Sequence, residues 1–215
     1  MQSLAKKISG IALLALCSMA HVVSAEIRLP QMLSDHAVLQ RNPPIHIWGW
    51  GEPGEHVTAH FHDQTVSTAV TSLGEWSLWL SPEHAGGPYE LTVDGSSEII
   101  VHDLLVGDVW FASGQSNMQI PLLGFPSSAV IKNAKEEIAQ ANHPQIRLLH
   151  VGLKSSDVPL DDITGRWSQC TPETTASFSA VAYFFGREIH REEPVPIGLI
   201  DATWGGTPTE IGRAS

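Results

Sequence analysis

Apolar and polar positions alternate with a period of two in the first half of the chain. Trp76, Leu78 and Leu80 share one face of a predicted strand, and residues 89–94 repeat the pattern. Turn-forming pairs such as Pro53-Gly54 and Asp94-Gly95 separate such runs about every ten residues, a spacing typical of antiparallel sheets. No segment of residues 26–102 has a helical period of useful length. We therefore predict a small antiparallel β-sandwich or barrel over residues 26–102.

The pattern changes after residue 102, where strands alternate with amphipathic helices. The predicted strands are 104–112, which is apolar enough to be covered on both faces, 146–151 and 197–202. A helix begins at Ser127 or Ser128 and is stopped by residues 142–144, and a second begins at Ser177 or Ser179 and ends at Pro194. Their predicted buried faces consist of Val130, Ala134, Ile138 and Ala141, and of Val181, Ala182, Phe185 and Ile189. This order predicts a parallel sheet with crossover helices in residues 103–215, a second domain joined to the first near residue 103.

The first 25 residues have the features of a secretory signal peptide. Lys6 and Lys7 precede an apolar run over residues 8–16, and the small residues 23–25 follow as a cleavage site. The run is too short to anchor the chain in a bilayer, so we expect a secreted or periplasmic protein with no membrane partner after cleavage. Cys170 would then be the only thiol, either buried and inert or lacking its partner.

Composition and charge narrow the classes of function. The formal net charge is −11, with 42% hydrophobic and 16% charged residues, which excludes a disordered acidic tail. Removal of residues 1–25 takes away two lysines and no acids and makes the chain still more acidic. Because acidic surfaces repel phosphate backbones, we expect no nucleic-acid partner.

The turn over residues 113–118 is the most informative candidate for chemistry, because it directly follows a predicted buried strand. In open α/β sheets, ligands and catalytic groups lie at the carboxyl ends of strands. Ser116 in this turn can present its hydroxyl to a cleft, beside backbone N–H groups that can stabilise an oxyanion. The alternative is that Ser116 only caps a helix. Gly205 and Gly206 follow the last predicted strand in the same way and either let backbone N–H groups approach a substrate closely or form a plain strand-to-loop turn. Two such turns after two parallel strands would open on the same edge of the sheet.

Three histidines, His56, His60 and His62, share one face of a predicted strand and offer a possible metal site. Asp63 is the only nearby acid and no cysteine joins them. We therefore interpret them as solvent-facing side chains and predict no metal.

The whole set of motifs resembles the secreted sialate O-acetylesterases, which are SGNH (GDSL-like) hydrolases. The motifs run in order through nearly the whole chain after residue 25: Pro30, Leu33-Ser34-Asp35, Val38-Leu39-Gln40-Arg41, Trp48-Gly49-Trp50, Pro53-Gly54, Ala85-Gly86-Gly87-Pro88-Tyr89, Gly107-Asp108-Val109-Trp110, Gly114-Gln115-Ser116-Asn117-Met118, Phe178-Ser179-Ala180, Tyr183-Phe184-Phe185, and Trp204-Gly205-Gly206-Thr207 with Glu210.

This resemblance implies a β-sandwich domain followed by a flavodoxin-like α/β/α catalytic domain without metal or organic cofactor. It makes Ser116 the nucleophile, with the backbone N–H of Ser116 and of Gly205 or Gly206 in the oxyanion hole. The implied substrate is an acetylated carbohydrate, either sialic acid or a related sugar, deacetylated through an acetyl-serine intermediate.

In the family, an Asp-x-x-His pair supplies the base and its orienting acid. This pair lies beyond the Trp-Gly-Gly-Thr turn and is absent from this chain. In addition, Gly212 stands where relatives carry tryptophan. His143, His150 and His190 are expected to be solvated rather than to replace the base. We therefore expect a truncated, poorly soluble and inactive fragment.

Two alternatives to the esterase stay open. One is a non-catalytic glycan-binding module that uses the tryptophans of the β-rich half, Trp48, Trp50, Trp76 and Trp79, as a sugar platform. The other is a truncated pseudogene product without function.

Overall fold

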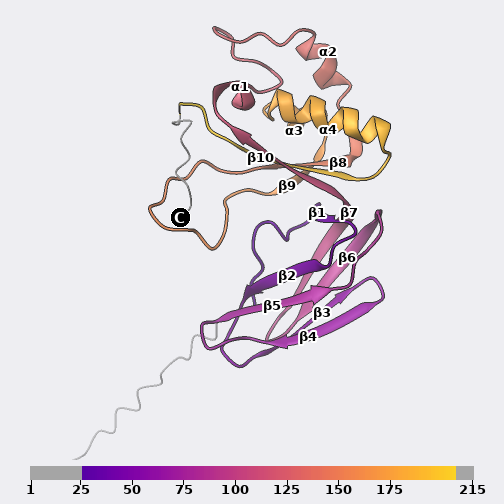
Figure 1. Ribbon diagram of the computed structural model, residues 1–215, viewed down its shortest axis with the longest axis vertical. Helices are drawn as coiled ribbons and strands as arrows, with labels where there is room; N and C mark the ends of the chain where they lie inside the picture. Colours follow the sequence, from indigo (N-terminus) through magenta and orange to yellow (C-terminus); the bar gives the residue numbers. More distant parts are fainter. Residues whose placement is uncertain (1–25, 207–215) are drawn as a thin grey trace, which may run out of the picture.

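The computed structural model describes residues 26–206. The predicted signal peptide, together with Thr207, Glu210 and Gly212, lies outside the described residues. Two parts follow each other along the long axis (Figure 1), a β-rich part and a part that also carries helices. The β-rich part contains β1 (Val38–Gln40), β2 (Ile45–Trp50), β3 (His56–Phe61), β4 (Gln64–Ala69), β5 (Glu75–Leu80) and β6 (Gly86–Asp94). The other part contains α1 (Ser116–Gln119), α2 (Ala134–Ala139), β8 (His143–His150), β9 (Trp167–Cys170), α3 (Pro172–Thr175), α4 (Ala180–Glu192) and β10 (Ile197–Thr203), and β7 (Glu98–Gly114) runs through both.

The β-rich part holds its core between two layers of strands. The antiparallel pair β2–β5 packs over a sheet in the order β4-β3-β6-β7, with Ile47 and Leu78 on one side and Phe61 and Leu91 on the other. Along β5, buried and exposed positions alternate, as the period of two predicts. That residues 26–102 form an independent β-sandwich domain stays a prediction.

The long strand β7 connects the two parts without interruption. Its first section pairs antiparallel with β6, and residues 108–114 pair in parallel with β10. The prediction of a strand covered on both faces is wrong for the second section. Residues 104–107 are buried, but Trp110 is 42% and Phe111 67% exposed. Trp110 packs edge-on against Phe185 of α4, whereas within residues 26–206 no element covers Phe111.

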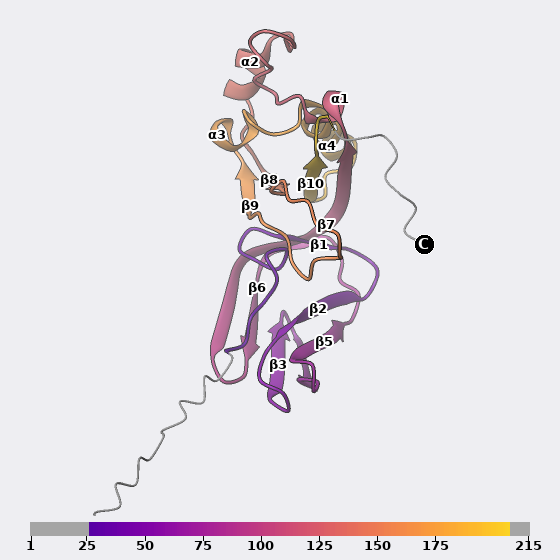
Figure 2. The ribbon, with the colours of Figure 1, turned by 90° about the vertical axis from the view of Figure 1, so that its left-hand side faces the viewer.

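The parallel sheet has the order β7-β10-β8, with the short antiparallel strand β9 at its edge (Figure 2). The predicted parallel arrangement is confirmed, and β10 is buried at all positions but Ala202. The sequence pattern did not predict β9 or α3. A second core, which includes Leu148, Tyr183 and Leu199, lies between this sheet and α4.

Both predicted helices need correction. The first is only α2, because Asn133 at its start has left-handed backbone (φ 57°), and Val130 is 89% exposed. The second helix begins as predicted, with Ser179 as its N-cap. However, Val181 and Phe185 are 46% and 41% exposed, and the buried stripe includes Ala182, Tyr183 and Gly186.

Gly186 explains why the buried stripe of α4 is shifted. A Cβ at this position would lie 2.6 Å from Leu199 Cδ1, so the helix backbone itself packs on β10.

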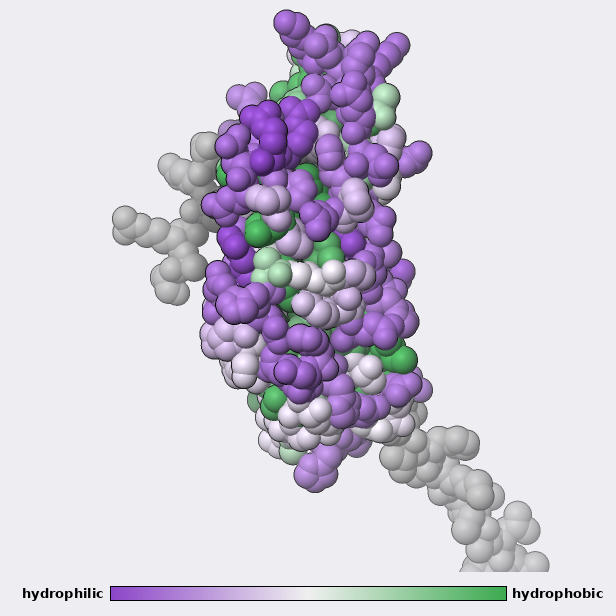
Figure 3. Space-filling model, turned by 90° about the vertical axis from the view of Figure 1, so that its right-hand side faces the viewer, coloured by the Kyte–Doolittle hydropathy of each residue, from purple (hydrophilic) through white to green (hydrophobic). Residues whose placement is uncertain are grey.

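No helix within residues 26–206 is long and apolar enough to cross a membrane. On the face in Figure 3, hydrophilic side chains predominate and exposed apolar side chains form small separate areas.

Candidate active site

Ser116 lies at the carboxyl end of β7, on the short helix α1 (Figure 2). Gly114 ends the strand with φ 140°, a conformation that favours glycine and turns the chain into the helix. The N-cap of α1 is Gln115, so the alternative that Ser116 only caps this helix is wrong. The Ser116 side chain is exposed, and its hydroxyl donates to Gln115 Oε1 at 3.0 Å.

Gly205 lies directly beside Ser116. Thr203 of β10 pairs with Gly114 of β7, and the Trp204 N–H donates to the Gly114 carbonyl at 2.9 Å. A Cβ on Gly205 would be 3.8 Å from Ser116 Cα. The sequence predicted that these two turns share one edge of the sheet, and the structure brings them together there.

Backbone N–H groups gather at this edge. The first N–H in α1 that donates to the Gln115 carbonyl is that of Met118, at 2.8 Å. The Ser116 N–H comes before this residue in the chain and has no partner from helical hydrogen bonding. The Gly205 N–H donates to Gln119 Oε1 at 2.8 Å. The Gly205 N–H is therefore already paired with a side-chain acceptor. Gly206 has φ 78°, and a Cβ there would have no neighbour within 4 Å.

A buried polar network holds the two turns in place. Asp201 is 1% exposed, and its Oδ1 accepts from Thr203 Oγ1 at 2.7 Å. Its Oδ2 accepts from the Ser179 N–H at 3.3 Å, and Ser179 Oγ donates to the Met118 carbonyl of α1 at 2.6 Å. Asp201 thus links the end of β10 to α1 through the cap of α4. Asp201 was not among the predicted site residues, although a lone acid within an apolar strand signals a buried partner.

The three histidines considered as a base do not contact Ser116. His150, half exposed at the end of β8, has Nδ1 3.1 Å from Asp201 Oδ2. β10 lies between β8 and β7, and within residues 26–206 the His150 ring contacts Asp201 of this middle strand rather than Ser116. His143 lies at the opposite end of β8, and burial lowers its pKa. His190 lies in the last turn of α4, and its Nδ1 is 2.8 Å from the carbonyl oxygen of Val195, which follows the helix. His143 and His190 are partly buried rather than solvated.

The histidines of the β-rich part, His56, His60 and His62, are exposed, as predicted. His60 Nε2 lies 3.2 Å from Asp94 Oδ2, and His62 Nδ1 lies 3.6 Å from Glu83 Oε1. The first contact is at the surface, whereas the Glu83 side chain in the second is only 15% exposed.

No family model matches the chain. A solved structure of a carbohydrate acetylesterase from Xanthomonas citri superposes with a TM-score of 0.81 at 38% identity and covers 86% of this chain and 42% of that one. The fold therefore matches that of a carbohydrate acetylesterase.

The curated relatives belong to a narrower class of acetylesterase. The sialate O-acetylesterase of Mus musculus is 33% identical in an alignment that covers 94% of this chain, and that of Homo sapiens is 36% identical in one that covers 85%. The chain is thus homologous over most of its length to the sialate O-acetylesterases. It spans 40% of the length of the mouse relative and 38% of the human one.

Proposed function

We propose that this chain supplies the nucleophile and part of the oxyanion hole of an esterase that removes acetyl groups from carbohydrate hydroxyls. The observation that carries the proposal is the position of Ser116 beside Gly205 at the carboxyl edge of a parallel sheet. The homology to sialate O-acetylesterases and the matching acetylesterase fold support it, and the relatives' name makes an acetylated sialic acid the first substrate to test.

In this reaction, Ser116 Oγ attacks the acetyl carbonyl carbon and loses its proton to a base. The carbonyl electrons move to the oxygen, and the resulting oxyanion accepts hydrogen bonds from the N–H groups of Ser116 and of Gly205 or Gly206. Collapse of the tetrahedral intermediate releases the sugar, which takes up a proton. Water then hydrolyses the acetyl-serine. Loss of one oxyanion-hole donor lowers the rate about 10²–10³-fold. The Gln119 side chain must therefore release the Gly205 N–H before this N–H can stabilise the oxyanion.

Within residues 26–206 no histidine contacts Ser116, so we propose that the isolated chain turns over very slowly. An added base should then replace the missing one in the first step. We expect that 4-nitrophenyl acetate with imidazole acetylates Ser116 and releases 4-nitrophenolate, and mass spectrometry of the peptide that carries Ser116 detects the acetyl group.

The matched control for this experiment is Ser113, an exposed serine on the same edge of the sheet. Ser116→Ala should abolish the imidazole-dependent acetylation, whereas Ser113→Ala and His150→Ala should leave it unchanged. Equal acetylation of Ser113 and Ser116 would remove Ser116 from its proposed role.

We also propose that residues 1–25 direct secretion and that the protein acts in an extracellular or periplasmic compartment. Expression in a secreting host should release a product that begins at residue 26. A product that retains Lys6 and Lys7 would contradict this.

A further inference from the structure

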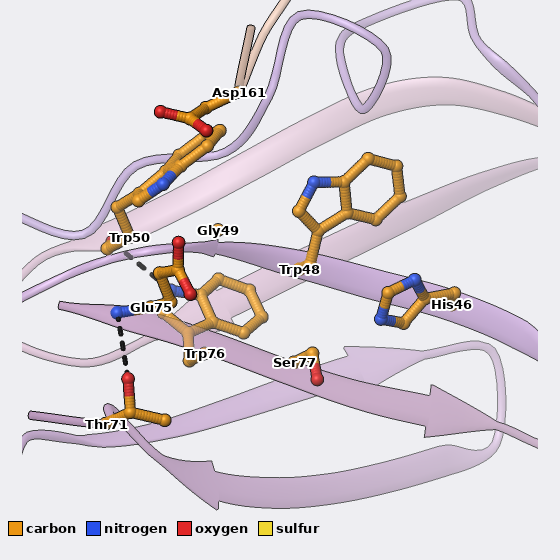
Figure 4. Close-up of a pocket in the computed structure, with 9 residues that line it drawn as sticks. All are labelled: His46, Trp48, Gly49, Trp50, Thr71, Glu75, Trp76, Ser77 and Asp161. Carbon is orange, nitrogen blue, oxygen red and sulfur yellow. Dashed lines mark hydrogen bonds between the residues drawn. The ribbon is translucent and has the colours of Figure 1, made fainter. Parts of the chain in front are cut away.

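A hollow lined by aromatic and acidic side chains lies on the outer face of the β2–β5 pair, away from Ser116. Alternation along β2 turns Ile45 and Ile47 into the core, so that Trp48 and Trp50 face outward. The hollow has a volume of about 320 Å³ and lies between these two indoles (Figure 4). Asp161, from the long loop before β9, borders it on one side.

Contacts on the two indoles fix their orientation. His46 stacks on Trp48 with ring centroids 5.1 Å apart and an angle of 19° between the planes. The Arg28 guanidinium lies 4.0 Å from the centre of the Trp50 ring. The Trp76 indole N–H donates to the backbone carbonyl of Trp50 at 3.2 Å and so holds the main chain, not the ring, of Trp50. The ring contacts with His46 and Arg28 therefore hold both indoles in place beside the open hollow. Because these side chains are already ordered, they lose little conformational entropy when a ligand binds.

Hydrogen-bonding groups surround the aromatic walls. Glu75 and Ser77 lie opposite Trp50 and Trp48 in the strand register, and both are exposed, as is Asp161. The Glu75 N–H donates to Thr71 Oγ1 at 3.4 Å, which ties this end of β5 to the preceding turn (Figure 4). Flat apolar walls with a few hydrogen-bond acceptors at their rim are typical of a small-ligand site.

We propose that this hollow binds a neutral pyranose unit of a carbohydrate. The C–H face of a pyranose fits against an indole, and its hydroxyls can donate to the carboxylates of Glu75 and Asp161. The same two negative charges repel an anionic sugar such as sialic acid. An organic cation is the other ligand that favours aromatic rings and carboxylates, but Arg28 already places a positive charge on Trp50. The site does not depend on the proposed esterase activity.

The test is a titration of the 215-residue chain followed by the indole N–H signals in NMR. The ligands are the methyl pyranosides of glucose, galactose, mannose and N-acetylglucosamine, with choline and N-acetylneuraminic acid as the alternatives. We expect saturable shifts of the Trp48 and Trp50 signals with at least one neutral pyranoside. Choline and N-acetylneuraminic acid should bind at least tenfold more weakly, or not at all.

Two variants keep the proposal falsifiable. Trp48→Ala should weaken binding of the pyranoside about tenfold, because it removes one wall. Trp79→Ala is the matched control, since Trp79 is 59% exposed on the same face but lies beyond His46, outside the hollow, and should change the affinity less than about twofold.

Glu75→Gln, which keeps the shape of the side chain, should retain binding of the neutral pyranoside. The absence of saturable shifts with all four pyranosides, or tighter binding of choline, would overturn the proposal. Equal effects of Trp48→Ala and Trp79→Ala would overturn it too.

Discussion

A buried ion pair where the two parts of the chain meet gives the sharpest prediction about stability. Arg147 of β8 is 3% exposed, and its guanidinium donates to the Asp103 carboxylate of β7 at 2.7 and 3.0 Å. His36 Nδ1 lies 2.6 Å from the same carboxylate, and Gln169 Nε2 of β9 donates to it at 3.0 Å. The hydrogen bonds from Arg147, followed by those from His36 and Gln169, outweigh burial and hold the pKa of Asp103 well below its usual range.

Asp103→Asn removes the charge and leaves the Arg147 guanidinium buried. Breaking a buried ion pair in this way costs about 3–5 kcal/mol. Asp103 is 26% exposed, so water compensates in part, and asparagine keeps one oxygen as acceptor. We therefore expect the free energy of unfolding to fall by about 3 kcal/mol, the lower end of that range, which lowers the melting temperature by roughly 6–12 °C.

The assay is thermal and urea unfolding of both proteins, with Asp157→Asn, a change of an exposed carboxylate, as the control. Because the folded pKa of Asp103 is depressed, its stabilisation is complete above the unfolded value of about 3.9 and is lost as the pH falls through the folded value. The difference between wild type and Asp103→Asn should thus persist at neutral pH and narrow below about pH 4. A neutral-pH difference no larger than that of Asp157→Asn would refute the reasoning.

Three further predictions use other contacts. Gly107→Ala should cost more than about 3 kcal/mol, because its Cβ would lie 2.6 Å from the Pro196 carbonyl carbon, and an unchanged melting temperature would contradict this close approach. Cys170 is fully buried, and burial raises its thiol pKa, so its peptide should resist alkylation until denaturant is added; modification of the native chain would contradict this. Ser179→Ala should lower stability by about 1 kcal/mol and also slow the acetylation of Ser116, whereas Ser179→Thr should restore both; an unchanged acetylation rate would show that Ser179 does not position α1.

The site residues that the sequence predicts are those whose positions follow from the direction of the strands. Ser116 and Gly205 follow two parallel strands, and parallel strands bring their carboxyl ends to one edge whatever their order. The cap at Ser179 is likewise local, since it needs only a hydroxyl before an amphipathic run. Such features need no knowledge of distant packing.

The features that the sequence could not give depend on tertiary contacts. The exposure of Phe111 depends on which elements cover β7, and the buried stripe of α4 depends on the approach of Gly186 to Leu199. The short helix α2 follows from the left-handed backbone of Asn133, which a pattern of apolar residues does not show. Asp201 was missed because two of its partners, His150 and Ser179, come from other segments of the chain.

The central claim is that Ser116 is a nucleophile whose oxyanion is held by the neighbouring amides, and a crystal structure of the chain phosphonylated at Ser116 tests it most directly. We predict that one phosphonyl oxygen lies about 2.7–3.1 Å from both the Ser116 and Gly205 nitrogens, with the Gln119 side chain displaced. A phosphonyl group directed into solvent, with Gln119 Oε1 still bound to the Gly205 N–H, would contradict the account.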